Sequence, residues 1–128
     1  MSLHWFHAYL YRHYSQNKRF ALDIGCGTRP YHSYFNCDYI GLDLYSRPYE
    51  DLKPDIFSDS KELPFKDNSF DFIVSSSVIP WIESIDSAFD EMFRVLEPKG
   101  VLLLINVNLR GLALHPKMKH YNKWNSKT

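Results

Sequence analysis

The stretch Phe20-Ala21-Leu22-Asp23-Ile24-Gly25-Cys26-Gly27 decides the fold class. Its first five residues are a short apolar run typical of a buried strand. Gly25 and Gly27 then flank Cys26 in a turn that a glycine-rich backbone makes easily. A glycine turn that directly follows a strand is weakly specific alone, but it is also how many nucleotide-binding α/β sheets begin. We therefore expect residues 20–27 to be the first strand and turn of such a sheet.

Strand and helix patterns alternate along the rest of the chain. The expected helices cover residues 3–16, 30–36 and 84–96, and the further expected strands cover residues 39–43, 55–58, 70–75 and 101–107. Helical spacing of apolar residues and flanking glycines and prolines indicate the helices, and short apolar runs indicate the strands. This alternation predicts an α/β fold: a Rossmann-like, mainly parallel sheet of about five strands with flanking helices.

Length and composition narrow the class of protein. The 128 residues predict one domain, with a core over 20–107 and an irregular basic tail over 108–128. An apolar fraction of 45% suits a packed core. No apolar run approaches the roughly 20 residues of a membrane helix, and the first 14 residues match neither a signal peptide nor an anchor. Two cysteines, Cys26 and Cys37, make neither a disulfide framework nor a zinc site, so we expect a cytoplasmic protein without a metal.

The formal net charge of zero hides an uneven distribution. Residues 1–22 carry three bases and no acid, residues 23–97 carry all 15 acids with six bases, and residues 98–128 carry six bases and no acid. The basic ends are either solvated surfaces or a patch for an anionic partner. Neither end is dense enough in Lys and Arg, or patterned with aromatic residues, to indicate nucleic-acid binding.

The acidic residues point to a ligand site. Ligands of parallel α/β sheets bind beyond the carboxyl ends of the strands, where the strand order reverses. Asp43 ends the second strand, where a carboxylate accepts both ribose hydroxyls of an adenosine-containing cofactor; the alternative is an acid satisfied by nearby backbone amides. Arg29-Pro30 stands where a dinucleotide site needs a small residue, which favours a cofactor without phosphates and disfavours a nicotinamide-dependent oxidoreductase.

Residues 20–107 resemble the class I S-adenosylmethionine-dependent methyltransferases, specifically the type 11 kind. The resemblance is carried, in family order, by residues 22–28, 39–43, 59–65, 69–75 and 93–102. It implies that Asp23 and the glycine-turn backbone bind the methionine part of S-adenosylmethionine, that Asp43 binds the ribose, and that Asp59 with the Ser60 backbone binds the adenine. The predicted cofactor-binding set is Asp23, Gly25, Cys26, Gly27, Asp43, Leu44, Asp59, Ser60 and Ser75. The alternative for Asp59 is a loop cap, and the alternative for Asp23 is a turn-stabilising acceptor.

The same resemblance implies methyl transfer to a small or medium-sized acceptor molecule. The sulfonium already activates the methyl group, so no protein nucleophile is expected and no catalytic residue is assigned. The alternative is a non-catalytic S-adenosylmethionine-binding module or partner subunit of a truncated methyltransferase fold.

Three departures from the family pattern bear on that choice. Arg29 replaces the usual third glycine and either pairs with the cofactor carboxylate or points to solvent. Pro80-Trp81 replaces a frequent Glu-His pair, and Trp81 either covers the cofactor or caps the core. The chain is also short at its C-terminal end and lacks the last two strands of the seven-stranded family sheet. Its fifth strand then lies at an edge of the sheet. Residues 109–114 could cover this edge, or a second copy could pair with it in a homodimer. The third alternative is that the chain is a fragment.

Overall fold

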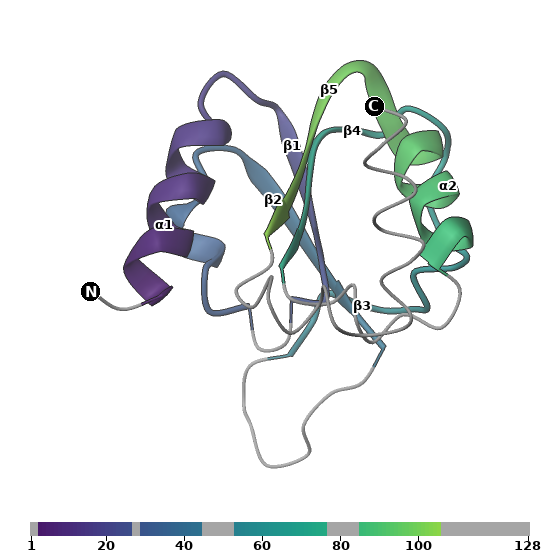
Figure 1. The fold of residues 1–128 in the computed structure, drawn as a ribbon, viewed down its shortest axis with the longest axis horizontal. Coiled ribbons are helices and arrows are strands. Elements are labelled where there is room, and N and C mark those ends of the chain that lie inside the picture. Colours follow the sequence, from purple (N-terminus) through teal and green to yellow (C-terminus); the bar gives the residue numbers. More distant parts are fainter. Residues whose placement is uncertain (1–2, 27–28, 45–52, 77–84, 106–128) are drawn as a thin grey trace, which may run out of the picture.

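Five parallel strands form one sheet, whose spatial order is β3-β2-β1-β4-β5 (Figure 1). The strands are β1 (Phe20–Ile24), β2 (Asp38–Asp43), β3 (Ile56–Phe57), β4 (Phe70–Ser76) and β5 (Leu96–Ile105). This computed structural model describes residues 3–26, 29–44, 53–76 and 85–105. The sheet confirms the predicted Rossmann-like architecture, and its strand order reverses between β1 and β4.

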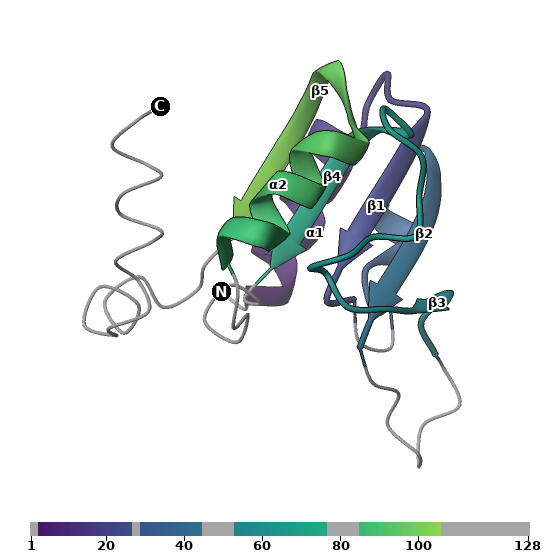
Figure 2. The same ribbon diagram turned by 90° about the vertical axis from the view of Figure 1, so that its right-hand side faces the viewer.

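Helices cover both faces of this sheet. Helix α1 (Leu3–Tyr14) and the short 3-10 helix η1 (His32–Tyr34) lie on one face, and α2 (Ile85–Val95) lies on the other (Figures 1 and 2). None of the helices in the described residues is long and apolar enough to cross a membrane. The two-sided cover explains why the central strands are apolar on both faces.

Two helix predictions were too long. Helix α1 ends at Tyr14 rather than at residue 16, because Asn17 adopts a left-handed φ of 63° and breaks the helical path. Within the predicted helix over 30–36, only η1 is helical, and Phe35 is already extended with φ −80° and ψ 131°. This extended backbone lets the Phe35 side chain pack into the core between α1 and the sheet.

The core consists of two layers, one on each face of the sheet. Alternate residues of the central strands contribute to opposite layers, as strand geometry requires. The layer under α2 contains Leu22, Ile24, Leu42, Ile73, Ala88, Phe89, Met92 and Val95, and the layer under α1 contains Tyr11, Ala21, Phe35, Phe72, Val74 and Ile105. Both layers include residues of β1 and β4, so these two strands are buried on both faces of the sheet.

Strand β5 begins earlier than the sequence indicated. The pattern Pro98-Lys99-Gly100 predicted a turn before a strand over 101–107, whereas β5 already pairs at Leu96 with Phe70 of β4. The next register pair joins Phe72 to Val101, so Pro98-Lys99-Gly100 forms a bulge within the strand. Proline is tolerated there because a bulge frees its backbone from the ladder of hydrogen bonds. Residues 106 and 107 of the predicted strand, and the predicted tail over 108–128, lie outside the described residues.

One carboxylate joins the amino ends of the two central strands. The Asp71 carboxylate of β4 accepts hydrogen bonds from the Arg19 amide (2.8 Å) and the Phe20 amide (2.9 Å) at the start of β1. The Arg19 guanidinium, in turn, contacts both Asp71 and Glu97 of β5. Asp71 therefore fixes where β1 begins against β4, at the edge opposite to the strand ends that carry the predicted site.

Replacing Asp71 with alanine is expected to lower the free energy of unfolding by about 1–3 kcal/mol, because two backbone amides lose a charged acceptor. Urea unfolding measures this loss, with Asp90→Ala on the exposed side of α2 as the control for removing a carboxylate. A loss no larger than that of the control would contradict a clamping role for Asp71.

Candidate functional site

The carboxyl ends of the strands bring predicted site residues to one edge of the sheet, at the bottom of Figure 1. Asp23 lies next to the end of β1, Asp43 ends β2, and Ser75 lies next to the end of β4. Asp59 and Ser60 follow β3 at the same edge. Strand order reverses here between β1 and β4, which is where doubly wound sheets bind ligands.

The glycine turn after β1 folds back against β2. Gly25 has a φ of 76°, a left-handed conformation that favours glycine. The amides of Gly25 and Cys26 both donate to the Leu42 carbonyl oxygen, at 2.8 and 3.1 Å. These two amides are thus paired within the protein, and a ligand at the turn would meet other backbone atoms. Gly27 lies outside the described residues.

Cys26 fills space in this turn and is not set up as a nucleophile. Its side chain is buried, and burial together with the nearby Asp23 carboxylate raises the pKa of the thiol well above its usual range. The thiol therefore stays protonated at neutral pH, and a protonated thiol is a poor nucleophile.

Asp23 is a buried carboxyl group with one strong hydrogen-bond donor. Only 4% of the residue is exposed, and the Tyr39 hydroxyl donates to its Oδ2 atom at 2.6 Å. Burial raises the pKa of Asp23 to about 7, an effect that the Tyr39 hydrogen bond opposes and the Asp43 charge adds to. The Asp23 carboxyl is therefore close to half ionised at neutral pH, and a cationic ligand group beside it would favour the carboxylate.

Arg29, at the position of the usual third glycine, is held by an ion pair that the sequence did not reveal. Its φ is 60°, and its Nη1 atom donates to Asp55 Oδ1 at 2.9 Å. The second oxygen of Asp55 accepts the Gly41 amide at 2.8 Å. The predicted orientation into solvent is therefore wrong, because Asp55 holds the guanidinium against β2 and only 24% of the Arg29 side chain is exposed. Pairing of Arg29 with a cofactor carboxylate stays a prediction.

Gly41 provides the space in which this packing occurs. A Cβ atom added at Gly41 would lie 2.8 Å from Cys26 Sγ and 3.0 Å from the Cγ and Cδ atoms of Arg29. Asp23 lies directly opposite Gly41 in the register of β1 and β2. The missing side chain at Gly41 thus lets the glycine turn approach the sheet closely.

The variant Gly41→Ala is expected to destabilise the protein by about 1–3 kcal/mol, because the added methyl group overpacks a closed site. When Gly41→Ala is introduced into the variant Cys26→Ala, most of this loss in unfolding free energy should disappear, because Cys26→Ala removes the nearest obstructing atom, Sγ. A double-mutant cycle of urea unfolding measures the coupling; additive effects of the two substitutions would argue against direct contact as the cause.

Asp43 presents a carboxylate at the end of β2. Its Oδ1 atom accepts the Leu44 amide at 2.7 Å, and its backbone carbonyl accepts the Ser58 amide at 3.0 Å. Leu44 is 49% exposed, so the chain leaves the sheet at this point with an apolar side chain directed outward. An acidic group followed by an exposed apolar one can bind the hydroxyls of a sugar and cover an attached ring.

Asp59 caps the turn that follows β3. Its Oδ1 atom accepts the Lys61 amide at 2.9 Å, its carbonyl accepts the Glu62 amide at 3.2 Å, and Lys61 Nζ lies 3.7 Å from its Oδ2 atom. This geometry is the loop cap that the sequence left open as an alternative. The cap keeps Asp59 and the half-buried Ser60 in a defined turn, and their contact with adenine stays a prediction.

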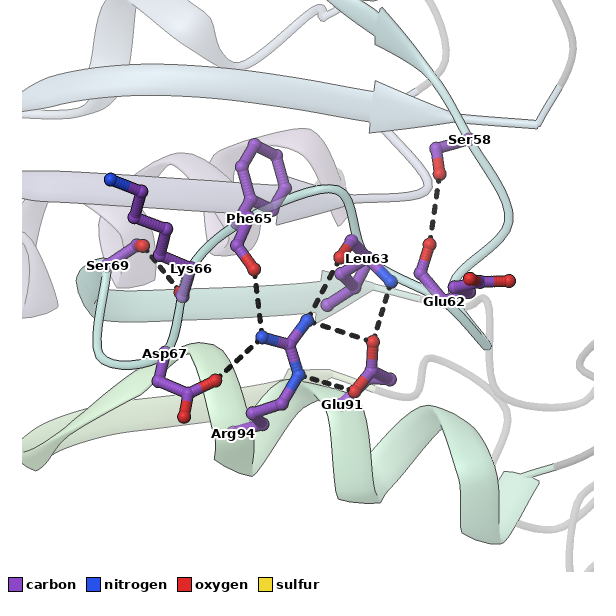
Figure 3. A network of polar contacts seen from close by, with 9 residues as sticks. All are labelled: Ser58, Glu62, Leu63, Phe65, Lys66, Asp67, Ser69, Glu91 and Arg94. Atoms are coloured by element: carbon purple, nitrogen blue, oxygen red, sulfur yellow. Dashed lines mark hydrogen bonds and ion pairs between the residues drawn. The ribbon is translucent and has the colours of Figure 1, made fainter.

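A polar network fixes the segment that connects this turn to β4 (Figure 3). All five guanidinium hydrogens of Arg94 are used: Nε bonds to Glu91 (2.6 Å), Nη1 to the Phe65 carbonyl and Asp67 (2.8 Å each), and Nη2 to the Leu63 carbonyl and Glu91 (3.0 Å each). Glu91 also accepts the Leu63 amide at 2.8 Å. The Arg94 ion pair lowers the pKa of Glu91, and the two carboxylates raise that of Arg94.

This network was missed at the level of sequence, although Glu91 and Arg94 are spaced i, i+3 on one helix. That spacing identifies an intrahelical ion pair but not the loop carbonyls that complete it. A bidentate guanidinium that binds backbone carbonyls is sensitive to geometry, because lysine cannot reproduce its planar set of donors. The network therefore positions residues 63–67 against α2 and, through them, the Asp59 turn.

The charge-preserving variant Arg94→Lys is expected to raise the exchange rate of the Leu63 amide hydrogen by about tenfold or more, because the segment loses most of its anchors. Hydrogen exchange followed by NMR measures this, with Arg12→Lys on α1 as the matched control. If the Leu63 amide keeps its protection, the Arg94 network is not what holds this segment.

Ser75 is a buried hydroxyl near the end of β4. The residue is fully buried, lies between Ile24 of β1 and Leu104 of β5, and within the described residues its Oγ atom has no hydrogen-bond partner. Buried hydroxyls are normally satisfied, so this atom marks a place where a polar contact is to be completed. It lies at the same edge as Asp23. The described residues contain no group of three or more side chains arranged to hold a metal ion.

Comparisons with known proteins identify a domain family. A profile of the methyltransferase domain family matches residues 22–104. The human protein named arginine-hydroxylase NDUFAF5, mitochondrial, is 30% identical over 98 residues, which cover 69% of this chain and 28% of that protein. The malonyl-[acyl-carrier protein] O-methyltransferase of Enterobacter lignolyticus (strain SCF1) is 29% identical over 96 residues, which cover 66% of this chain and 38% of that enzyme. The chain thus spans well under half the length of these curated relatives.

A solved structure has the same fold. Phosphoethanolamine N-methyltransferase 2 of Haemonchus contortus, in complex with phosphomonomethylethanolamine and S-adenosylhomocysteine, superposes with a TM-score of 0.63 at 26% identity. The match covers 78% of this chain and 28% of that chain.

Proposed function

The chain belongs to the methyltransferase domain family, and on that premise we propose that it binds S-adenosylmethionine at the carboxyl edge of its sheet and transfers the methyl group to a small or medium-sized acceptor. The predicted site residues and the relatives that are methyltransferases by name support the proposal. The identity of the acceptor is left open, because these relatives act on different molecules.

The observation that carries this proposal is the pair of acids at the ends of adjacent strands. Asp23 is buried with a pKa of about 7, and Asp43 lies half-buried where β2 ends. The first suits the α-ammonium group of the cofactor, because a cation relieves the cost of burying a carboxylate. The second suits a ribose diol, because a carboxylate can accept two hydroxyl hydrogen bonds. The Ser75 hydroxyl at the same edge, which has no hydrogen-bond partner within the described residues, is consistent with a polar ligand.

The residues of the chain need only bind and orient the reactants. When bound, S-adenosylmethionine supplies an activated methyl group on its sulfonium sulfur. Asp23 and Asp43 would hold the two ends of the cofactor's methionine–ribose portion, and the Asp59–Ser60 turn would receive the adenine. Fixing the reactants in line can contribute about 7–11 kcal/mol to lowering the barrier, without any protein nucleophile.

Calorimetry with S-adenosylhomocysteine tests the binding step. We expect a dissociation constant in the micromolar to low-millimolar range for the whole chain, with saturation at one ligand per chain. Transfer of a labelled methyl group to members of an acceptor panel then tests the reaction. Absence of binding at millimolar ligand would refute the proposed function.

A second candidate is a non-catalytic module that binds the cofactor for a partner subunit. It is considered because the human relative is named an arginine-hydroxylase, so a match to this domain does not by itself require methyl transfer. Normal binding of S-adenosylhomocysteine, combined with no methyl transfer to any acceptor in the panel, would support this candidate over the first.

We also propose that the protein is cytoplasmic and acts without binding nucleic acid or a membrane. We propose further that it forms a homodimer, in which β5 pairs with β5 of a second copy. Within the described residues Cys26 and Cys37 form no disulfide with each other, in keeping with a reducing compartment. In the same residues β5 pairs with β4 alone, which leaves its other edge open to a further strand. Fractionation of cells and light scattering of the purified chain test these two points; a monomer at micromolar concentration would refute the pairing.

A further inference from the structure

We propose that Tyr39 is a positioning residue, whose hydroxyl orients the Asp23 carboxylate and helps to keep it ionised for the α-ammonium group of the cofactor. This inference rests on the proposed function and adds a residue to it. Tyr39 was not among the predicted site residues, because its place as the second residue of β2 resembles that of any strand residue with an aromatic ring.

The register of the sheet makes the contact possible. Tyr39 lies opposite Ala21 and Gly41 lies opposite Asp23, so Tyr39 and Asp23 are diagonal neighbours on adjacent parallel strands. Since Gly41 has no side chain, nothing of β2 stands between them at that position. The Tyr39 ring can therefore lean along the strand until its hydroxyl reaches Asp23 Oδ2 at 2.6 Å.

The ring of Tyr39 is held in place by neighbours on η1 and just after it. It stacks on His32 with a centroid separation of 4.7 Å, and the Phe35 ring meets it edge-on at 4.8 Å. A hydroxyl fixed in this way restrains one oxygen of the Asp23 carboxylate. The other oxygen is then oriented for a second donor, as a preorganised binding site requires.

The electrostatic surroundings of Asp23 explain why the Tyr39 hydroxyl matters for the ionisation of this carboxyl group. Among the described residues, the titratable groups around Asp23 include Asp43 from β2, Cys26 from the turn and Tyr31 next to η1, and the cation Arg29 is ion-paired with Asp55. The strand on the other side contributes Val74 opposite Asp23. Within the part of the chain that the structure describes, the Tyr39 hydrogen bond favours the ionised form, while burial and the Asp43 charge oppose it.

The conservative variant Tyr39→Phe tests the proposal with and without the cofactor. In the ligand-free protein, titration of the Asp23 carboxyl followed by NMR should move upward by about one pH unit, because a charge-assisted hydrogen bond is lost. With S-adenosylhomocysteine, affinity at neutral pH should fall about fivefold relative to the parent chain, and the ratio of the two affinities, measured at the same pH, should return toward one as the pH is raised by about two units. The matched control is Tyr34→Phe on η1, which should leave both profiles unchanged.

The outcomes separate this inference from the proposed function. An unchanged Asp23 titration in Tyr39→Phe, or a loss of affinity that high pH does not restore, would overturn the role of Tyr39 while leaving binding by the parent chain intact. Failure of the parent chain to bind S-adenosylhomocysteine would refute the proposed function and, with it, the cofactor-directed part of this inference.

Discussion

The variant Asp43→Ala is expected to weaken the binding of S-adenosylhomocysteine by about 30- to 100-fold, because the ribose hydroxyls lose a charged acceptor for two hydrogen bonds. The fold should survive, since the Asp43 side chain is only half-buried and the backbone bond between its carbonyl and the Ser58 amide remains. Isothermal calorimetry measures the loss in affinity, and urea unfolding verifies the fold.

The matched control is Asp38→Ala, which removes the same charge from the opposite end of the same strand. It should leave cofactor affinity unchanged within about twofold, because exposed charges at a distance are largely screened by salt. Equal effects of the two substitutions would mean that Asp43 acts through net charge, and normal affinity of Asp43→Ala would remove the ribose role altogether.

The variant Asp23→Asn is expected to have opposite effects on stability and on binding. The neutral amide should bind S-adenosylhomocysteine at least about tenfold more weakly, because the α-ammonium group loses its anionic partner. At alkaline pH it should nevertheless be more stable than the parent chain, because it carries no buried charge.

The sign of the pH effect follows from the direction of the shift. Burial raises the pKa of Asp23 to about 7 in the folded chain, from about 4 in an unfolded one. Asp23 therefore contributes its full stability below about pH 4, and this contribution falls as the pH rises toward 7 and is lost above that value. The total amounts to about 4 kcal/mol, at 1.36 kcal/mol for each unit of pKa.

Between pH 5 and pH 8, the difference in unfolding free energy between Asp23→Asn and the parent chain should change by about 2–3 kcal/mol in favour of the variant. Urea unfolding at both pH values measures it, and the exposed Asp90→Asn is the control for removing a carboxylate. If the variant and the parent chain show parallel pH profiles, Asp23 does not titrate near neutrality in the folded protein.

The elements of the fold could be predicted because their signals are local. The apolar runs of β1 and β4, the glycine turn and the spacing on α2 each lie within a few residues and agree with one another. The predictions failed where the backbone followed a tertiary partner instead. Pro98-Lys99-Gly100 has the composition of a turn, yet pairing of Leu96 with Phe70 extends β5 across it.

The same distinction separates the acids that could be predicted from the contacts that could not. Asp23 and Asp43 lie at strand ends, where the motif and the topology agree on a ligand site. Asp55 and Tyr39 act through side chains that reach another strand or turn, at sequence separations of 26 and 16 residues. No periodic pattern marks such contacts. They depend on the sheet register and on the space left by Gly41.

The strand order also has a consequence for how this chain folds. Strands β1, β2 and β3 form one half of the sheet, and β4 and β5 form the other. The hydrogen bond from the Phe20 amide to Asp71, which joins the two halves, links residues 51 positions apart in the sequence. Closing a loop of about 50 residues costs roughly 3.5 kcal/mol of chain entropy, so we expect pairing of the two halves to be a slow step of folding. A ligand bound by Asp23 and Asp43 on one half, and by β4 on the other, would add its binding free energy to that pairing. The cofactor would then be a folding ligand as well as a reactant, and its removal would first increase hydrogen exchange between β1 and β4.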